Sequence, residues 1–414
     1  MVNIKLPASV EFILRRLKSA GFEAYIVGGC VRDSLMGIEP HDWDICTSAR
    51  PEETIRVFDD FKIVPTGLKH GTVSVMVANV LYEITTFRSD GEYSDNRHPD
   101  SVSFVKDLKT DLSRRDFTMN AMAYCYDTGL VDLYGGAEDV EKKLVRCVGD
   151  PIDRFSEDAL RILRTVRFAI RFGFEIEEKT LCAMARLQTN VHSISAERIR
   201  DELIKILCAI DFNNVNQAYY RFFLAIIYSY CDYDNWDVDF STIPRQLLHE
   251  DNDLLSILYT LFDAECTKKL RFSNEITKYV RDVRSYSDFI YSELNAFVHN
   301  ERDLQYYART LLGSSNIDVL KDAIKRIKYT YDINEEFNML LYMLHLQLLV
   351  CDMRSDPVHV SDLDINGYDL MELGFKGKEI GFTMDRLLDM VIYDKVENKK
   401  EVLLKEAKRM KEEC

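Results

Sequence analysis

The chain changes character near residue 150, and this change limits the folds open to it. Before that point, short runs typical of β-strands alternate with glycine turns, at residues 23–29, 42–46, 71–77 and 81–88. From Pro151 onward, apolar residues recur at helical spacing, as in residues 159–172, 198–210, 254–262 and 337–349. The pattern predicts an α+β protein: an N-terminal head with a small mixed or antiparallel sheet and helices, followed by an elongated all-α remainder.

Length and cysteine usage narrow the class further. At 414 residues the chain is long enough to form several domains, each with its own core. Its ten cysteines are scattered without a C-x-x-C pair, so the sequence suggests neither a zinc site nor a disulfide framework, and we expect small buried thiols in a reducing compartment. We find no N-terminal leader and no apolar run near the roughly 18 to 20 residues of a membrane span, so we expect a cytoplasmic protein without membrane association.

The formal net charge of −16 opposes a nucleic-acid partner, because affinity for nucleic acids comes mainly from neutralising phosphates. Two local clusters of cations weaken that objection. One is formed by Arg154, Arg161, Arg164, Arg167 and Arg171, and the other by Lys395, Lys399, Lys400, Lys405, Lys408 and Lys411. Acidic residues are interleaved with both clusters, so they are only a weak indication of a basic surface.

Residues 25–33, Tyr-Ile-Val-Gly-Gly-Cys-Val-Arg-Asp, have the pattern of a buried strand, a Gly-Gly turn and the start of a helix. This geometry suits a phosphate, since glycine allows close backbone approach and a helix N-terminus offers free N–H groups. Arg32 lies in the first turn and adds a candidate charged contact. Taken alone, a Gly-Gly pair is usually only a tight turn.

The run Asp42-Trp43-Asp44 follows within the next strand pattern. On a strand, residues i and i+2 share a face, so both carboxylates are expected to project side by side while Trp43 turns into the core. Two parallel carboxylates repel each other unless a cation lies between them, which is a magnesium arrangement. Glu83, in the otherwise apolar run 81–88, is either a third metal ligand or a paired structural charge.

These motifs together resemble the polymerase β-type nucleotidyltransferase superfamily. The run Arg114-Arg115-Asp116 resembles the R-R-D motif of the class II tRNA nucleotidyltransferase and poly(A) polymerase family, the CCA-adding branch included. Residues 132–139, Asp-Leu-Tyr-Gly-Gly-Ala-Glu-Asp, are similar to the linker of that family, and residues 157–161 are similar to its E-D-x-x-R motif. The resemblance extends over essentially the whole chain, with the motifs in the family's order.

The resemblance implies template-independent addition of C, C and A to the 3′ end of tRNA from CTP and ATP, with release of pyrophosphate. Asp42 and Asp44 are then expected to be the catalytic residues and to hold two Mg²⁺ ions. Nucleotide-binding residues carried over from the family are Gly29, Arg32, Arg115, Asp158, Arg161, Arg164 and Arg167. The implied domains are a catalytic head (1–146), a neck for base recognition (147–210), a helical body (211–351) and a tRNA-binding tail (352–414), with no obligatory protein partner.

The neck residues Asp158 and Arg161 have complementary hydrogen-bonding capacities. Cytosine and adenine each present an amine donor beside a ring-nitrogen acceptor, whereas uracil and guanine present an acceptor beside an N–H donor. A carboxylate only accepts and a guanidinium only donates, so the pair complements C and A and rejects U and G. We expect this pair, on the polar face of a helix that also carries Arg164 and Arg167, to replace a template; a solvated helix face is the alternative. The later neck run from Ser195 to Leu203 is interpreted as structural, with Ser195 as a helix N-cap.

Three other functions remain open at this point. The loop 89–99 keeps the pattern that CC-adding enzymes generally lack, so the chain is either a complete CCA-adding enzyme or an A-adding enzyme that works with a separate CC-adding partner. The form G-x-x-H-G-T at residues 67–72 disfavours a bacterial poly(A) polymerase. An inactive tRNA-binding protein is disfavoured because all of the expected carboxylates are present.

Overall fold

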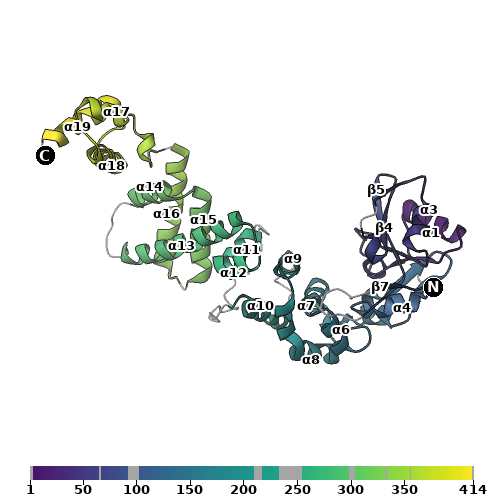
Figure 1. Cartoon of the computed structure of the whole chain (residues 1–414). Helices are drawn as coiled ribbons and strands as arrows, with labels where there is room; N and C mark the ends of the chain where they lie inside the picture. Colours follow the sequence, from purple (N-terminus) through teal and green to yellow (C-terminus); the bar gives the residue numbers. More distant parts are fainter. Residues whose placement is uncertain are drawn as a thin grey trace. The chain divides into compact units, whose positions relative to one another are not determined.

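The structure is a computed structural model that describes residues 3–64, 67–91, 102–208, 217–232, 254–297, 304–331, 333–354 and 356–412. The chain forms two compact units, Met1–Asp234 and Asn235–Cys414. The first unit combines a β-sheet with helices, and the described part of the second unit is helical (Figure 1). The α+β class predicted from the sequence is therefore confirmed.

The first unit begins with a head built on a seven-stranded sheet, whose order is β3-β4-β5-β2-β1-β8-β9. Strands β2 and β5 are parallel, and the other neighbouring pairs are antiparallel. The strands of this sheet are β1 (Ala24–Val27), β2 (Ile45–Thr47), β3 (Lys62–Val64), β4 (Thr72–Val77), β5 (Val80–Thr86), β8 (Met122–Cys125) and β9 (Gly129–Asp132). A separate hairpin pairs β6 (Arg88–Asp90) with β7 (Val102–Phe104).

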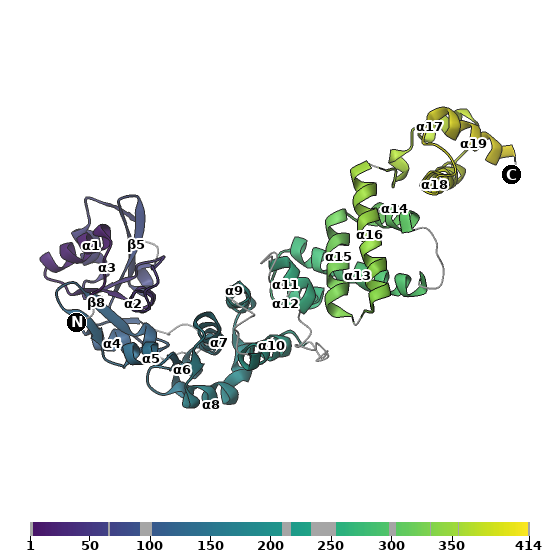
Figure 2. The ribbon, with the colours of Figure 1, turned by 180° about the vertical axis from the view of Figure 1, so that it is seen from behind.

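Short helices cover the sheet and connect its strands. They are α1 (Ala8–Ser19), α2 (Gly29–Leu35), α3 (Pro51–Val57), α4 (Leu108–Ser113) and α5 (Gly136–Glu141), with 3₁₀ helices at Leu68–His70 and Thr118–Asn120. Helices α1 and α3 lie side by side against the sheet (Figures 1 and 2). Helix α1 buries Val10, Ile13, Leu14 and Leu17 in the head core, a spacing that places one apolar stripe against the strands.

The structure corrects two details of the predicted strands. Strand β2 begins at Ile45 rather than at residue 42, so Asp42 and Asp44 lie in the extended segment that leads into it. The Asp44 carbonyl nevertheless accepts a hydrogen bond from the Val27 amide, which holds this segment beside the end of β1. Strands β8 and β9 were not predicted, although β8 pairs with β1 on one side and with the edge strand β9 on the other.

The rest of the first unit is mainly helical. Its elements are β10 (Leu144–Val145), α6 (Pro151–Glu157), α7 (Leu160–Phe172), β11 (Glu175–Ile176), α8 (Glu178–Leu187), a 3₁₀ helix (Gln188–Ser193), α9 (Ala196–Leu207) and α10 (Gln217–Cys231). Helix α7 packs against α6, α9 and α10, and it is buried on almost every side, with Arg164 the partly exposed exception between Leu160 and Ile170. Ser195 occupies the predicted N-cap position of α9, but its side chain makes no capping bond.

The second unit contains two apolar cores within its described residues. The first lies among α13, α14, α15 and α16, and α13, α15 and α16 lie side by side in both views (Figures 1 and 2). The second joins α17, α18 and α19. The elements are α11 (Leu254–Leu261), α12 (Ala264–Lys269), α13 (Asn274–Phe297), α14 (Leu304–Ser314), α15 (Ile317–Thr330), α16 (Glu335–Arg354), a 3₁₀ helix (Val360–Asp362), α17 (Gly367–Glu372), α18 (Lys378–Ile392) and α19 (Lys400–Glu412).

Two further findings bear on the predicted organisation. Helix α16 continues to Arg354, past residue 352, where the predicted tail begins. Among the residues that the structure describes, no helix has the length and apolarity needed to cross a bilayer. The division into head, neck, body and tail remains a prediction, because the compact units number two rather than four.

Candidate functional site

The Gly28-Gly29 turn has the predicted strand–turn–helix form. Strand β1 ends at Val27, Gly28 adopts a φ of +84°, and α2 begins at Gly29. A Cβ atom on Gly28 would lie 3.1 Å from Nη1 of Arg115. The turn therefore needs glycine both for its backbone angle and for the guanidinium that covers it.

The two aspartates predicted to bind metal follow this turn in the chain and lie near it in space. In the parallel pairing of β2 with β5, Ile45 is opposite Ile84, which places Asp44 next to Glu83 on one face of the sheet. Although Asp44 stays open to solvent on one side, desolvation by the surrounding protein raises its pKa. Arg115 opposes this rise, whereas the negative charges of Glu83 and Asp42 add to it.

This donor set fits a divalent cation. The mutual repulsion of neighbouring carboxylates falls when a cation lies between them. Among the described residues, no three His, Cys, Asp or Glu side chains are arranged as a metal site by themselves. Mg²⁺-type sites commonly use one or two carboxylates together with water and substrate phosphates, and Asp42 with Asp44 supplies that number.

A chain of buried polar contacts connects the glycine turn with helix α7. Arg32 bonds Asp33 (Nη2 to Oδ1, 2.7 Å) and Asn120 (Nη1 to Oδ1, 2.5 Å). Asn120 donates to Asp116 (3.0 Å), and Asp116 accepts from Arg164 at 2.5 and 2.9 Å. Burial alone would raise the pKa of Asp116, but Arg164 and Asn120 lower it to about 2. Arg32 and Arg164 are thereby held in fixed positions on the two sides of this chain.

Asp158 does not lie on the same helix as Arg161, which corrects the prediction. It ends α6 in an extended conformation, with φ −145° and ψ 101°, and α7 starts two residues later. Its carboxylate accepts two hydrogen bonds from Arg198 of α9, at 2.8 and 3.2 Å, and one from the Leu160 amide at 3.1 Å. Arg198 thus fixes the orientation of the carboxylate.

Arg161 is held equally firmly. Its side chain is buried, and Nη1 donates to Glu157 at 2.7 Å and to the Arg154 carbonyl at 3.2 Å. Nη2 donates to the Arg114 carbonyl at 3.1 Å. The side chains of Asp158 and Arg161 therefore have separate partners. The hydrogen bond between the two residues joins their backbones, from the Arg161 amide to the Asp158 carbonyl at 3.0 Å.

The donors of Arg161 and the acceptor positions of Asp158 that have no partner in the described part of the structure suit a base with an amine beside an acceptor nitrogen. A guanidinium has five N–H donors, of which three of Arg161 are engaged, so two remain. A carboxylate offers about four acceptor positions, of which three of Asp158 are engaged, so about one remains. One acceptor from Asp158 and a donor from Arg161 complement cytosine and adenine.

Arg167 lies deeper in the same region. Its Nε donates to Glu202 of α9 at 2.6 Å, and desolvation lowers its pKa. The rings of Phe168 and Phe172 lie beside Arg32, whose Cζ is 5.2 and 4.7 Å from their centroids, and Arg167 lies 4.2 Å from the Phe168 centroid. The predicted nucleotide contacts of Arg32 and Arg167 stay predictions, since both guanidinium groups are engaged in ion pairs.

Sequence reasoning missed the residues that position the predicted ones. Asp116 and Glu157 were quoted inside motifs without a role, Asn120 was not considered, and Arg198 was interpreted as part of a structural helix. The motif R-R-D and the pair Glu157-Asp158 were the available signals, but the long separation between Arg198 and Asp158 hid their pairing. The loop 89–99 lies outside the described residues from Glu92 onward.

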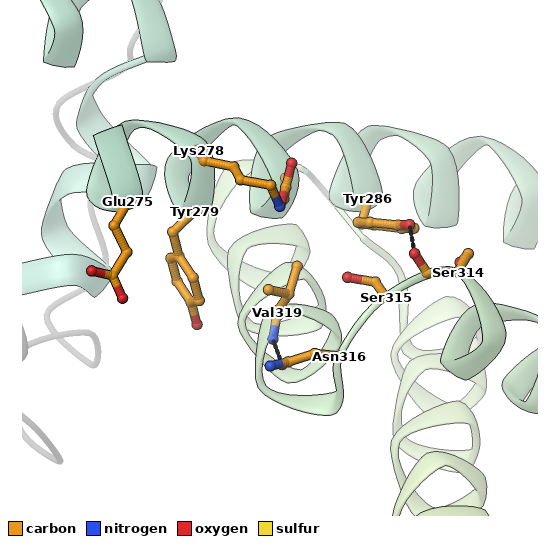
Figure 3. A pocket seen from close by; sticks show the side chains of 9 residues that line it. Glu275, Lys278, Tyr279, Tyr286, Ser314, Ser315, Asn316 and Val319 are labelled. Atoms are coloured by element: carbon orange, nitrogen blue, oxygen red, sulfur yellow. Dashed lines mark hydrogen bonds and ion pairs between the residues drawn. The ribbon is translucent and has the colours of Figure 1, made fainter. Parts of the chain in front are cut away.

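The second unit has a pocket of its own, with a volume of about 440 Å³, between α13 and the turn that precedes α15 (Figure 3). Tyr286 donates to the Ser314 carbonyl at 2.7 Å, and Asn316 caps α15. Lys278 is paired with Asp282 at 2.6 Å. None of the predicted site residues lines this pocket.

Known proteins resemble both halves of the described architecture. A family model described as the poly A polymerase head domain matches residues 24–146, and one described as the probable RNA and SrmB-binding site of polymerase A matches residues 173–214. The CCA-adding enzyme of Ligilactobacillus salivarius (strain UCC118) is 35% identical, with 97% of this chain and 96% of the relative covered. The CCA-adding enzyme of Enterococcus faecalis (strain ATCC 700802 / V583) is 34% identical, with 96% and 95% covered.

Solved structures agree with these relatives. The crystal structure of the Bacillus stearothermophilus CCA-adding enzyme in complex with CTP has a TM-score of 0.68 and 26% identity, with 98% of each chain covered. The Thermotoga maritima CCA-adding enzyme complexed with tRNA shares the fold, with a TM-score of 0.62, 22% identity and coverage of 96% and 93%. With relatives about one-third identical over nearly its whole length, this chain belongs to the CCA-adding enzyme family of nucleotidyltransferases.

Proposed function

We propose that this protein adds C, C and A to the 3′ end of tRNA without a template, taking the nucleotides from CTP and ATP and releasing pyrophosphate. The observation that carries this proposal is the hydrogen-bonding capacity left at Asp158 and Arg161, which matches C and A, in a unit that also presents Asp42 and Asp44. The full-length relatives named CCA-adding enzymes and the solved relative with CTP support it. Since the substrate is tRNA, we expect the enzyme to work in the cytoplasm.

Asp42 and Asp44 are the proposed catalytic residues and would hold Mg²⁺. When bound, one of the two ions would lower the pKa of the tRNA 3′-hydroxyl, and the other would neutralise charge on the triphosphate. The two carboxylates position the reacting groups, and Glu83 either joins them as a ligand or adds negative charge beside Asp44. The hydroxyl then attacks the α-phosphate in line, and pyrophosphate leaves.

The proposed nucleotide-binding residues are Gly29, Arg32, Arg115, Asp158, Arg161, Arg164 and Arg167. Gly29 starts α2 directly after the turn, where N–H groups are available to an anion. Arg32 and Arg167 are engaged in buried ion pairs, so a direct phosphate contact needs these pairs to open. We keep the four-part division, with residues 352–414 as the tRNA-binding tail, as part of the proposal.

Base selection follows from Asp158 and Arg161. Asp158 accepts from the exocyclic amine of cytosine or adenine, and Arg161 donates to the adjacent ring nitrogen. Uracil and guanine would leave both groups facing like groups, and an unpaired buried polar group costs about 1–3 kcal/mol. Two such mismatches cost about 2–6 kcal/mol together, which lowers incorporation of the wrong nucleotide by roughly thirtyfold to ten-thousandfold.

The test uses three tRNA transcripts, ending in the discriminator base, in -C and in -CC, each with labelled CTP or ATP. We expect addition of two C residues and one A, with an end of the correct length in each case. Extension of the -CC transcript alone identifies an A-adding enzyme. Continued addition of A beyond the complete end identifies a poly(A) polymerase, and binding without extension identifies an inactive tRNA-binding protein.

A further inference from the structure

A small arginine-lined pocket lies beside Asp44 and contains residues that the proposed function does not use. Its volume is about 220 Å³, and its polar lining is formed by Asp44, Thr72, Thr85, Arg88, Arg114 and Arg115. The parallel register of β2 and β5 places Thr85 beside Cys46, two residues after Asp44, and Thr72 is opposite Thr85 on β4. Asp44, Thr85 and Thr72 therefore share one face of the sheet.

The pocket has the chemistry of an anion site. Three guanidinium groups line it, and planar guanidinium forks bind phosphate oxygens well. Asp111 is buried behind Arg114 and Arg115 and accepts from both, at 2.8 and 3.1 Å. Asp111 balances part of this charge, but its fixed bonds also hold the two guanidinium groups in place.

The threonines add a neutral donor. The hydroxyls of Thr72 and Thr85 bond each other at 3.0 Å. Because only one of the two hydrogens can lie between the oxygens, the other hydroxyl hydrogen remains available to a ligand. A phosphate oxygen is a suitable acceptor for it.

The size and position of the pocket decide which anion of the reaction it suits, the nucleoside triphosphate or a phosphate of the tRNA. Pockets that hold a drug-sized ligand are about 300–1,000 Å³, so this pocket suits a single sugar-phosphate unit better than a nucleoside triphosphate. Arg115 lies between the Gly28-Gly29 turn and the pocket, since its Nη1 covers Gly28 while the side chain also lines the pocket. The triphosphate is expected on the Gly28-Gly29 side of Arg115, which leaves the pocket to the other substrate.

Resting on the proposed function, we propose that this pocket binds the phosphodiester that joins the last two nucleotides of the tRNA. Arg88 and Arg114 bind its phosphate oxygens. The hydroxyl hydrogen that Thr72 and Thr85 do not share also donates to one of these oxygens, and the terminal ribose hydroxyl then lies next to Asp44. Arg88 thereby becomes a residue for tRNA positioning rather than for nucleoside triphosphate binding.

The experiment combines a protein change with a change in the tRNA. Wild type, Arg88→Met and Arg88→Lys are assayed with tRNA ending in -CC, whose terminal linkage is either a phosphodiester or a neutral methylphosphonate. Loss of one charged contact worth about 1.4 kcal/mol raises the KM for tRNA about tenfold. We expect this rise in the KM for tRNA for Arg88→Met and a smaller rise for Arg88→Lys. The KM for ATP should stay within about twofold of wild type, a difference of about 0.4 kcal/mol.

The decisive result is the combination of both changes. On methylphosphonate tRNA, Arg88→Met should cost nothing further, because the contact is already lost. A full penalty on both tRNAs, or a raised KM for ATP with an unchanged KM for tRNA, overturns the proposal. Arg56→Met is the matched control: Arg56 is an exposed arginine on α3 outside the pocket lining, and its replacement should leave both KM values unchanged.

Two further comparisons keep the test independent of protein folding and of the proposed function. With the wild-type enzyme, neutralising the terminal linkage should cost more than neutralising the linkage one nucleotide further in, and equal costs contradict the assignment. A wild-type enzyme that extends no tRNA end refutes the proposed function. If the wild-type enzyme extends tRNA but the penalties of Arg88→Met and of the methylphosphonate linkage add, only the assignment of the pocket is refuted.

Discussion

Replacement of Arg198 by alanine tests whether base selection depends on a fixed Asp158. Arg198 donates to both oxygens of the Asp158 carboxylate, at 2.8 and 3.2 Å, from a different helix. Hydrogen bonds between charged groups contribute about 1.5–3 kcal/mol. In Arg198→Ala the carboxylate loses this support and can rotate, so it can accept from the ring N–H of uracil or guanine.

The expected effect is a loss of selectivity. If the lost orientation of the carboxylate costs about 1.4 kcal/mol, close to the lower value for one such bond, selectivity falls about tenfold. If it costs half of that, selectivity falls only about threefold. We therefore expect the ratio of kcat/KM for CTP to that for UTP to fall about tenfold, and kcat/KM for CTP itself to fall less. The assay is single-nucleotide incorporation into tRNA that ends in the discriminator base.

Arg200→Ala is the matched control for this experiment. Arg200 lies on the same helix but bonds the neighbouring Asp201 at the surface, so its loss should leave selectivity unchanged. An unchanged CTP to UTP ratio in a folded Arg198→Ala enzyme would refute the reasoning that Arg198 positions Asp158.

Three other predictions follow from the same structure. Asp42→Asn or Asp44→Asn should abolish nucleotide transfer while tRNA binding in a gel-shift assay persists, and appreciable turnover in either variant counts against their catalytic role. The pKa of Asp116 is about 2 in the folded protein and about 3.9 when unfolded, because Arg164 and Asn120 stabilise its carboxylate. The ionised carboxylate therefore contributes about 2.6 kcal/mol of stability above pH 4 to 5, which is lost as the pH falls towards 2. Urea titrations should show a shallower acid loss of stability in Asp116→Asn, and parallel curves for the two proteins contradict this. Gly28→Ala should destabilise the fold and raise the KM for CTP, because its Cβ meets Arg115. Gly129 has a similar φ of +77° but open space around its Cβ position, so Gly129→Ala should lower stability alone. Equal KM values for CTP in the two variants contradict the role of the turn.

The local motifs could be predicted from the sequence because their geometry depends on adjacent residues. Gly28 and Gly29 form the predicted turn before a helix, and the helix at residues 160–172 matches the apolar spacing of its sequence. The start of β2 was misplaced because the D-x-D pattern is compatible with either a strand or an extended entry segment. Strand β8 was missed because all four of its residues are buried, so they show no alternation of apolar and polar side chains.

The partners of the candidate site could not be predicted because they come from distant parts of the chain. Asp158 is held by Arg198 of α9, and Asp116 holds Arg164 of α7. Charge alone allows many pairings among these residues, and a helical face of arginines predicts a solvated surface as readily as a buried one. Asp158 bonds Arg198 of α9, and this long-range choice is decided by the packing of α9 against α7.

A crystal structure of the enzyme with bound CTP tests the central claim most directly. The account predicts the cytosine amine within hydrogen-bond distance of Asp158, its ring nitrogen within the same distance of Arg161, and Arg198 still bonded to Asp158. A cytosine ring bound away from Asp158 and Arg161, with both side chains keeping only the partners described above, would contradict it.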